Sequence, residues 1–204
     1  NLTNEGLLLT ITTPHTGRSP RDRFIVQESA TGGEIWWGAF NTPLALDKFE
    51  RLKADVEVYL GQHDVFVRDV HACAEPAHRL KLRMITESGC HNLFAHNMFL
   101  RPTDRELADF MPEFTVLHAP GMLANPDRHG TRSSTGVVLN LDKREVLIVG
   151  THYSGEIKKA IFSALNYLLP KSGVLSMHCS ANIGRNGDTA IFFGLSGTGK
   201  TSLS

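Results

Sequence analysis

Residues 190–201 read AIFFGLSGTGKT, an apolar run that leads directly into a glycine-rich turn. The turn fits the pattern G-x-x-x-x-G-K-[ST] of a phosphate-binding loop, and a preceding strand is the context in which that loop occurs. Its glycines let backbone N–H groups converge on phosphate oxygens, and the dipole of a following helix favours negative charge. The sequence therefore predicts a nucleotide-phosphate site made of Gly194, Leu195, Ser196, Gly197, Thr198, Gly199, Lys200 and Thr201.

The last two residues of this turn carry its most specific chemistry. The lysine of such a loop extends to the β- and γ-phosphates of the nucleotide, so we assign that role to Lys200. The hydroxyl of Thr201 is expected to ligate the metal ion that accompanies the nucleotide. The predicted ligand is therefore a nucleoside triphosphate together with its divalent cation.

Upstream of the loop, the pattern of apolar residues predicts a mixed α/β fold. Alternation of apolar and polar residues, or short apolar runs, predicts strands at residues 7–12, 23–26, 65–70, 80–86, 114–118, 137–141, 146–149, 174–179 and 189–193. Apolar residues three and four apart predict helices at residues 43–59, 90–98 and 155–169. Thr42 and Ser154 are the expected N-caps, and Pro170 is expected to end the last helix.

A turn-rich segment, residues 170–173 (PKSG), is the best candidate for a domain boundary. We therefore predict two domains, residues 1–173 and the beginning of a second domain at residues 174–204. A further turn is expected at residues 182–188.

The amino-acid composition argues against nucleic acid and membranes as binding partners of the protein. Of the 204 residues, 41% are hydrophobic and the formal net charge is +0, so there is no overall basic field to attract nucleic acid or an anionic membrane. No apolar run approaches the roughly 18 residues that a membrane span needs. The first residues lack the pattern of a signal peptide. Three widely spaced cysteines, Cys73, Cys90 and Cys179, suggest a reducing cytoplasm.

Six upstream segments and the phosphate loop, in the same order, resemble the ATP-dependent phosphoenolpyruvate carboxykinase family. The segments are TGRSPRDRF (16–24), IWWG (35–38), NMFLRP (97–102), GTHYSGEIKK (150–159), NYLLP (166–170) and MHCSAN (177–182). The resemblance covers about residues 12–204, and the GLSGTGKT form of the loop is typical of the ATP-using class. It departs at His152, Ser154 and Ser202, none of which is a family catalytic position.

The resemblance implies a fold and a reaction. The fold is a phosphoenolpyruvate carboxykinase-like N-terminal mixed α/β domain, followed by the start of a P-loop-containing mononucleotide-binding domain. The reaction converts oxaloacetate and ATP to phosphoenolpyruvate, ADP and CO2 in gluconeogenesis, by metal-assisted decarboxylation and phosphoryl transfer to the enolate. The implied cofactors are ATP, Mg2+ carried with the nucleotide and Mn2+ bound by the protein. We expect a cytoplasmic monomer whose partners are these small molecules, without nucleic acid or membrane.

Three predicted catalytic residues face the substrate. Arg18 offers a planar fork suited to a carboxylate, and by resemblance it holds the substrate carboxylate or the departing CO2. Tyr153 resembles the family tyrosine that lies along the substrate and hydrogen-bonds CO2. Lys158 by resemblance meets substrate and phosphate oxygens. Without the resemblance, each would more often be a solvated or packing residue.

Two nitrogen ligands are implied for the protein-bound metal. By resemblance these are Lys159, which also contacts substrate, and His178, and nitrogen ligands suit Mn2+ better than Mg2+. A lysine ligates a metal only as the neutral amine. The adjacent Lys158, the positive end of the helix and the metal itself all disfavour a second charge there. His91 and His96 show no ligand spacing, so we interpret both as structural.

Several parts of the family site would lie beyond residue 204, including a metal-binding aspartate, the acidic motif for the nucleotide's Mg2+, a second substrate arginine and the adenine pocket. We therefore expect the 204-residue segment alone to be inactive. Two other interpretations remain open: a different phosphoryl-transfer enzyme with the same loop, or a nucleotide-binding regulatory module without turnover. The second leaves the segments around Arg18, Tyr153 and Lys159 unexplained.

Overall fold

The computed structural model describes residues 3–195 and 197–203, and for Thr201 it describes the backbone alone. The chain forms two compact units, Asn1–Phe162 and Ser163–Ser204. None of the helices in the described part of the chain has the length and apolar character that a membrane crossing needs.

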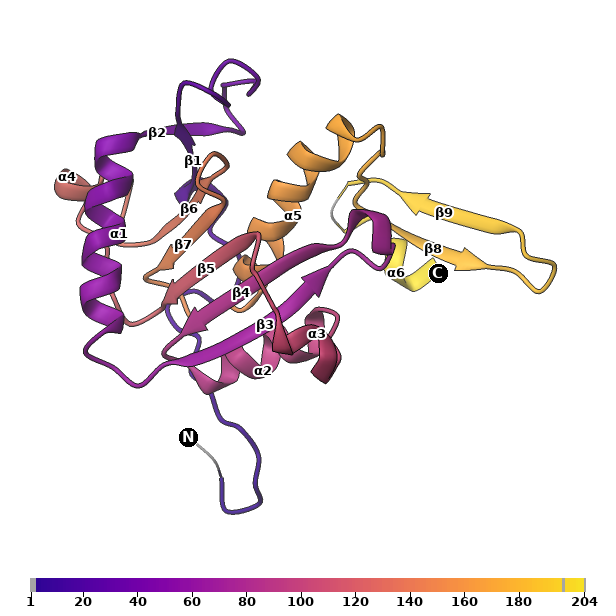
Figure 1. The fold of residues 1–204 in the computed structure, drawn as a ribbon, viewed down its shortest axis with the longest axis horizontal. Helices are drawn as coiled ribbons and strands as arrows, with labels where there is room; N and C mark the ends of the chain where they lie inside the picture. Colours follow the sequence, from indigo (N-terminus) through magenta and orange to yellow (C-terminus); the bar gives the residue numbers. More distant parts are fainter. Residues whose placement is uncertain (1–2, 196, 204) are drawn as a thin grey trace. The chain divides into compact units, whose positions relative to one another are not determined.

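The first unit is built on a seven-stranded sheet in the order β2-β1-β6-β7-β5-β4-β3 (Figure 1). The strands are β1 (Arg23–Gln27), β2 (Thr42–Ala45), β3 (Phe66–Ala72), β4 (Leu80–Thr86), β5 (Phe114–Ala119), β6 (Gly136–Asn140) and β7 (Glu145–Val149). Neighbouring strands are parallel except in the pairs β6–β7 and β3–β4. The sheet is therefore mixed and mostly parallel, as expected of an α/β protein.

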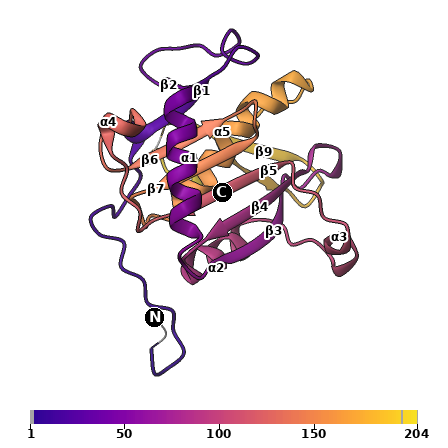
Figure 2. The same cartoon turned by 60° about the vertical axis from the view of Figure 1, so that its left-hand side comes forward.

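Helix α1 (Leu46–Leu60) covers one face of this sheet, and Figure 2 shows it lying across the strands. Its buried residues Phe49, Leu52 and Val56 recur at the spacing of one helix face. They join a core to which the strands contribute Phe24, Val26, Leu44, Leu117, Ala119, Val138, Leu147 and Val149. The short helix α4 (Pro126–His129) packs beside α1. Burial of this apolar face holds α1 to the sheet.

Residues of the opposite parity on the strands face the other helices. On β5, the ring of buried His118 lies 4.3 Å from the ring of His91 in α2 (Gly89–Met98), and α2 packs on β3 and β4. On β1, Arg23 pairs with Glu156 in the first turn of α5 (Gly155–Lys171). The first unit is therefore layered, with α1 on one face and α2 and the start of α5 on the other.

Smaller elements complete the first unit. Helix α3 (Asp104–Ala108) begins with a capping box in which Thr103 and Glu106 satisfy each other's backbone donors. Two 3-10 turns, η1 (Pro20–Asp22) and η2 (Pro76–His78), precede β1 and β4. None of these short elements was predicted, because each is too brief to show a hydrophobic period.

Most predicted strands and helices of the first unit are confirmed, with two corrections. Residues 7–12 do not form a strand but run as irregular chain, with Leu8 in an isolated bridge. The predicted helix start at Pro43 is also wrong, because Thr42–Ala45 pairs with β1 as a parallel edge strand and the N-cap is Ala45. An edge strand tolerates the missing N–H of proline.

Helix α5 begins where predicted, at Gly155, and buries Ile157, Ile161 and Ala164 as expected. Leu165 and Leu168 are half-buried. The helix continues through Pro170 to Lys171, so the proline lies in the last turn instead of preceding the end.

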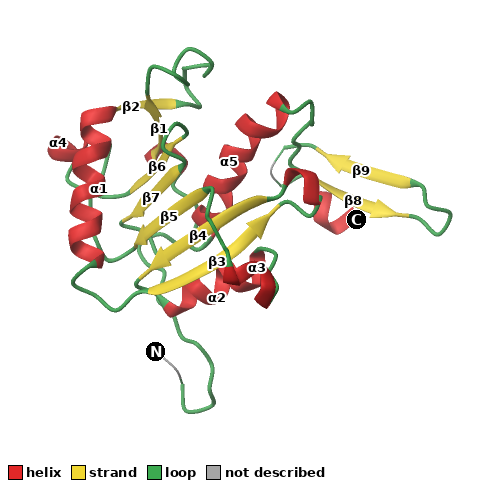
Figure 3. Cartoon of the chain, in the orientation of Figure 1, coloured by secondary structure: helices red, strands yellow, loops and turns green. Residues whose placement is uncertain are grey.

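The second unit contains an antiparallel hairpin of β8 (Cys179–Ile183) and β9 (Thr189–Phe193), shown in yellow in Figure 3, and the helix α6 (Lys200–Leu203). The prediction for β9 is confirmed. The predicted strand at 174–179 is wrong. The strand that pairs with β9 begins five residues later, at Cys179, and ends at Ile183, inside the segment predicted as a turn. The turn itself is closed by the Gly184 N–H donating to the Asp188 carbonyl at 2.7 Å.

Strand direction gathers several loops at one edge of the sheet. β6 is parallel to β1 and antiparallel to β7, so the beginning of β1 and the end of β7 lie at the same edge. β5 and β4 run parallel to β7 and also end there. The residues before β1 and β6 and those after β4, β5 and β7 are thus neighbours in space, although they are far apart in sequence.

Gly150 begins the chain segment after β7 and has a φ of +69°. A Cβ atom at Gly150 would collide with the backbone oxygen of Ser134. Both the positive φ and this close approach require glycine here. Gly173 has a similar φ of +74°, but a Cβ atom there would meet nothing within 4 Å.

We predict that Gly150→Ala destabilises the protein more than Gly173→Ala does. Both substitutions incur the cost of a left-handed conformation, about 1–2 kcal/mol. Gly150→Ala adds the collision with Ser134, for at least about 1 kcal/mol more. Urea unfolding of the two variants measures the difference, and equal unfolding midpoints would contradict the close packing of the β7 exit.

Candidate active site

The loop before β1 presents Arg18 to solvent while its neighbours are buried. Ser19 is 7% exposed and Asp22 is 4% exposed, whereas Arg18 is exposed. The Asp22 carboxylate accepts from Arg132 Nη2 at 3.0 Å and from Ser133 Oγ at 2.8 Å. The backbone that follows Arg18 is thus held in place while the side chain of Arg18 is exposed.

A second set of hydrogen bonds ties this loop to the exit of β7. The Thr135 hydroxyl donates to the Gly150 carbonyl at 3.0 Å, and His15 Nε2 lies 2.9 Å from the same hydroxyl oxygen. Because the hydroxyl proton points to Gly150, His15 Nε2 must be the donor to Thr135. His15 Nδ1 then accepts from the Ser19 hydroxyl, 3.1 Å away. The Arg18 loop and the chain after β7 therefore share one hydrogen-bonded support.

The segment after β7 carries Tyr153 and the two predicted lysines. The Tyr153 N–H donates to Thr151 Oγ1 at 3.2 Å, and its carbonyl accepts from the Glu156 N–H at 3.1 Å. A Cβ atom on Gly155 would lie 2.5 Å from the Tyr153 ring, so the ring packs where only glycine leaves room. This packing fixes Tyr153, half-buried, immediately before α5.

The first turns of α5 place the predicted lysines on different parts of the helix surface. Lys158 is exposed and Lys159 is half-buried. The Lys159 Nζ lies 5.0 Å from the centre of the Phe162 ring, a cation–π contact. The structure thus brings Arg18, Tyr153, Lys158 and Lys159 to one edge of the first unit.

Glu156 connects these two segments and was not identified from the sequence. Its carboxylate is fully buried, and its Oε1 accepts from the Ser19 N–H at 2.7 Å. Its Oε2 lies 3.3 Å from Arg23 Nε. Burial lowers the pKa of Arg23, while the Glu156 charge raises that pKa and the nearby Arg18 charge lowers it. An acidic residue in the first turn of a helix is usually solvated, so sequence pattern alone gave no signal of burial.

The predicted phosphate loop lies in the second unit, between β9 and α6. Gly197 and Gly199 have φ values of +80° and +81°. The Lys200 ammonium donates to the carbonyls of Gly194 at 3.0 Å and Leu195 at 2.7 Å, and Thr198 Oγ1 also donates to Leu195. Lys200 thus lies over the loop at which it is predicted to bind phosphate. Ser196 and the Thr201 side chain lie outside the described residues.

The predicted metal ligands lie in different units, Lys159 in the first and His178 in the second, just before β8. An amine and an imidazole are donors that suit a transition metal such as Mn2+, so their chemistry fits the implied ion. Within residues 3–195 and 197–203, no cluster of three or more His, Cys, Asp or Glu side chains could hold a metal ion. Ligation of one ion by Lys159 and His178 stays a prediction.

A buried cluster of histidines lies behind this edge of the sheet. His91 Nε2 lies 2.9 Å from the His152 carbonyl oxygen and Nδ1 lies 2.8 Å from Ser88 Oγ. His118 Nδ1 lies 2.8 Å from Thr86 Oγ1. Burial lowers the pKa of His91 to about 4 and holds the pKa of His118 well below its usual range. His91, expected to be structural, is fully buried and uncharged at neutral pH.

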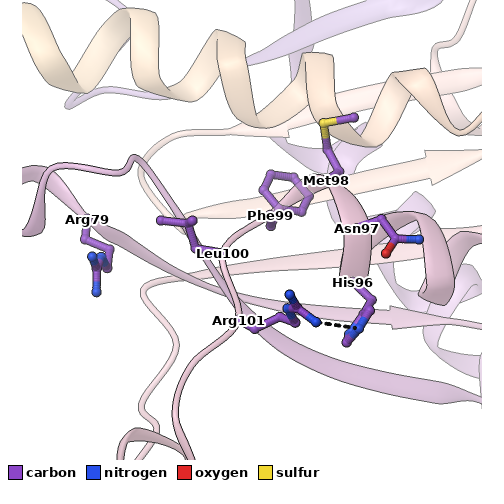
Figure 4. Close-up of a pocket in the computed structure, with 7 residues that line it drawn as sticks. All are labelled: Arg79, His96, Asn97, Met98, Phe99, Leu100 and Arg101. Atoms are coloured by element: carbon purple, nitrogen blue, oxygen red, sulfur yellow. Dashed lines mark hydrogen bonds between the residues drawn. The ribbon is translucent and has the colours of Figure 1, made fainter.

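Two hollows lie elsewhere on the first unit. One, of about 540 Å3, contains the segment NMFLR and is drawn in Figure 4; it is lined by Arg79, His96, Asn97, Met98, Phe99, Leu100 and Arg101. Arg101 Nη1 and Arg68 Nη1 lie 3.3 Å and 3.1 Å from opposite nitrogens of His96. The other, of about 1000 Å3, is lined partly by residues 6–11 and reaches His152. Neither is lined by Arg18, Tyr153 or the two lysines.

The fold and the site together define a mixed α/β protein that gathers an arginine, a tyrosine and two lysines at one edge of a mostly parallel sheet. A family model described as Phosphoenolpyruvate carboxykinase, in its ATP form, matches residues 1–204. The chain belongs to this family.

Curated relatives agree with this assignment. Proteins named Phosphoenolpyruvate carboxykinase (ATP) are 53% identical in Thermus thermophilus, 54% in Flavobacterium johnsoniae and 51% in Brevibacillus brevis. The alignments cover 100%, 98% and 100% of this chain, and 39%, 38% and 39% of the respective relatives. The chain therefore spans about two fifths of the length of the curated relatives that it matches.

We predict that the free energy of unfolding falls as the pH drops from 6.5 towards 4. The unfolded histidine binds a proton below its usual pKa of about 6.5, whereas folded His91 resists protonation until about pH 4. Stability from the neutral histidine is thus complete above pH 6.5 and is lost on acidification, by up to about 1.4 kcal/mol per pH unit for each such group.

The measurement is urea unfolding between pH 4 and 7.5. His91→Gln should make the stability less dependent on pH in this window, and the exposed His63→Gln is the control for replacing a histidine. An unchanged slope in His91→Gln would show that the buried cluster does not produce the effect.

Proposed function

We propose that the full-length protein containing these residues converts oxaloacetate and ATP to phosphoenolpyruvate, ADP and CO2. One observation carries this proposal: the Arg18 loop is bonded to the segment that contains Tyr153 and the two lysines. The bonds are made by Glu156 and by the hydrogen bonds of His15 and Thr135. Membership of the family supplies the identity of the reaction.

Arg18 and Tyr153 bind the keto acid in this proposal. Oxaloacetate is a dianion, and the exposed guanidinium of Arg18 offers two parallel donors to a carboxylate. Tyr153, held by its packing on Gly155, supplies a hydroxyl that can donate to the carboxylate that leaves as CO2. Rigid placement of both groups lowers the entropic cost of reaching the reactive geometry.

Lys158 and Lys200 bind the phosphate oxygens in this proposal. Lys158 lies exposed in the first turn of α5, where the positive end of the helix dipole also favours anions. The Lys200 ammonium, which lies over the carbonyls of Gly194 and Leu195, would exchange these acceptors for the β- and γ-phosphates of ATP. Residues 194–201, including Ser196 and Thr201, form the proposed nucleotide-phosphate site.

The proposed metal ligands are Lys159 and His178 for Mn2+, and Thr201 for the Mg2+ that accompanies ATP. When bound, Mn2+ supplies Lewis-acid stabilisation of negative charge on the substrate. The chain's own contribution would be Lys159 and His178 as nitrogen donors. Lys159 can ligate the ion only as the neutral amine, so it would give up its cation–π contact with Phe162 on binding the metal.

The proposal also covers the pathway, the cellular location, the oligomeric state and the domain division. We infer a role in gluconeogenesis, a cytoplasmic monomer, and a division into a substrate domain of residues 1–173 and the beginning of a nucleotide domain at residues 174–204. A different phosphoryl-transfer enzyme or a regulatory module would not need Arg18 and Tyr153 on one support. Release of CO2 from oxaloacetate that depends on ATP and Mn2+, by the full-length protein, separates the proposal from both alternatives.

Arg18→Gln in the full-length protein should raise the KM for oxaloacetate by at least about 10-fold, because it removes a charged, forked partner of the carboxylate. The KM for ATP should change by less than about 3-fold. Arg21→Gln is the matched control, since Arg21 is an exposed arginine of the same loop whose backbone carbonyl, not its guanidinium, accepts from Arg132. An unchanged KM for oxaloacetate in Arg18→Gln would remove the substrate role of Arg18.

Residues 1–204 expressed alone should show no ATP-dependent decarboxylation of oxaloacetate, because the family's remaining metal and adenine ligands lie beyond the phosphate loop. Steady-state assays of CO2 release with Mn2+ and Mg2+ test this expectation, with the full-length protein as the positive control. Turnover by the isolated segment would show that these residues complete the site by themselves.

A further inference from the structure

Glu156 is an unusual acid for its position in the fold. It lies in the first turn of α5, two residues before Lys158, yet it has no exposed surface. A carboxylate is rarely buried unless it is paired, because removing its charge from water is costly. Its burial therefore points to a structural task near the proposed substrate site.

Its two contacts differ in quality. The Ser19 N–H donates to Glu156 Oε1 at 2.7 Å, a short, directional hydrogen bond. Glu156 Oε2 and Arg23 Nε are 3.3 Å apart, but within the described residues neither atom makes a hydrogen bond of good geometry. The contact with Arg23 thus supplies opposite charge, while the contact with Ser19 fixes a position.

The hydrogen bond to Ser19 acts directly on Arg18. The Ser19 nitrogen belongs to the same planar peptide unit as the Arg18 carbonyl. Anchoring that N–H therefore orients the peptide plane from which the Arg18 side chain departs. The contacts of Asp22 and His15 hold the loop to the residues before β6, whereas Glu156 holds it to the helix that carries the lysines.

We propose that Glu156 is a positioning residue that sets Arg18 relative to Tyr153, Lys158 and Lys159 through the backbone of Ser19. The inference rests on the proposed function, in which Arg18 binds a carboxylate of the substrate. A displacement of about 1 Å in such a group can cost on the order of 100-fold in rate, so one buried anchor is enough to matter.

The carboxylate also moderates repulsion between two arginines. Arg18 lies near enough to Arg23 for its charge to lower the Arg23 pKa, and the Glu156 charge opposes that effect. A neutral residue in place of Glu156 would leave the guanidinium groups of Arg18, in the loop, and Arg23, at the start of β1, without this compensation. A test must therefore separate the loss of the anchor from the loss of the charge.

The separation uses two double variants of the full-length protein that share Arg23→Met. Arg23→Met/Glu156→Gln keeps an amide oxygen to accept from Ser19, whereas Arg23→Met/Glu156→Met has similar length and no acceptor. We expect the Met variant to show a KM for oxaloacetate at least about 10-fold above that of the Gln variant. The KM for ATP should differ by less than about 3-fold between them. Equal KM values for oxaloacetate would overturn the proposal.

A second comparison asks whether Glu156 acts through Arg18. Adding Arg23→Met/Glu156→Met to Arg18→Gln should raise the KM for oxaloacetate little beyond Arg18→Gln alone, because the group being positioned is already gone. A full additional rise would mean that Glu156 acts on another group, and would also overturn the proposal. Should the Met variant fail to fold, Glu156→Asp is the substitute, because it keeps the charge and shortens the reach to Ser19. An unchanged KM for oxaloacetate in Glu156→Asp would then overturn the proposal that the bond from Glu156 to Ser19 positions Arg18.

Failure of the proposed function would look different. If Arg18→Gln itself leaves the KM for oxaloacetate unchanged, Arg18 does not bind the substrate and both conclusions fall. If Arg18→Gln raises that KM but the Gln and Met variants behave alike, Arg18 keeps its role and only the positioning by Glu156 is lost.

Discussion

The position of β6 between β1 and β7 is the constraint on which the candidate site depends. Because β6 runs parallel to one neighbour and antiparallel to the other, the start of β1 and the end of β7 meet at one edge. The residues around Arg18 and the segment of Tyr153 and the lysines are thereby adjacent, although more than a hundred residues separate them. A uniformly parallel arrangement would have placed the two segments at opposite edges.

Adjacency alone does not fix a catalytic geometry, and hydrogen bonds between the two segments supply the remaining order. His15 and Thr135 link the Arg18 loop to Gly150, and Glu156 links it to α5. The acids that hold the loop are compensated by arginines other than Arg18: Asp22 by Arg132 and Glu156 by Arg23. The support is therefore close to neutral, while the side chain that it presents is a cation.

Sequence pattern predicted those strands and helices in which the order of apolar and polar residues matches the buried and exposed faces. The strand at 80–86 was predicted within its observed limits, because alternate residues such as Leu82 and Met84 are buried and their neighbours are not. The strand β2 was missed because its four residues run straight into a helical pattern, and its pairing with β1 is a long-range fact. Arg18 and Lys158 were predicted through motif resemblance, and their roles stay predictions. The burial of Glu156 could not be predicted because it is decided by Ser19 and Arg23, which are distant in sequence.

The two ligands of the proposed function are strongly anionic, whereas the chain has a formal net charge of +0. A global positive field would attract polyanions of every kind. Here the acids Glu156 and Asp22 order a cationic segment locally, at the edge where Arg18 and Lys158 are exposed. Buried histidines that stay uncharged behind the same edge, such as His91 and His118, add no competing charge at neutral pH. In the proposed function, selectivity for a small dianion would follow from the placement of a few side chains and not from the total charge.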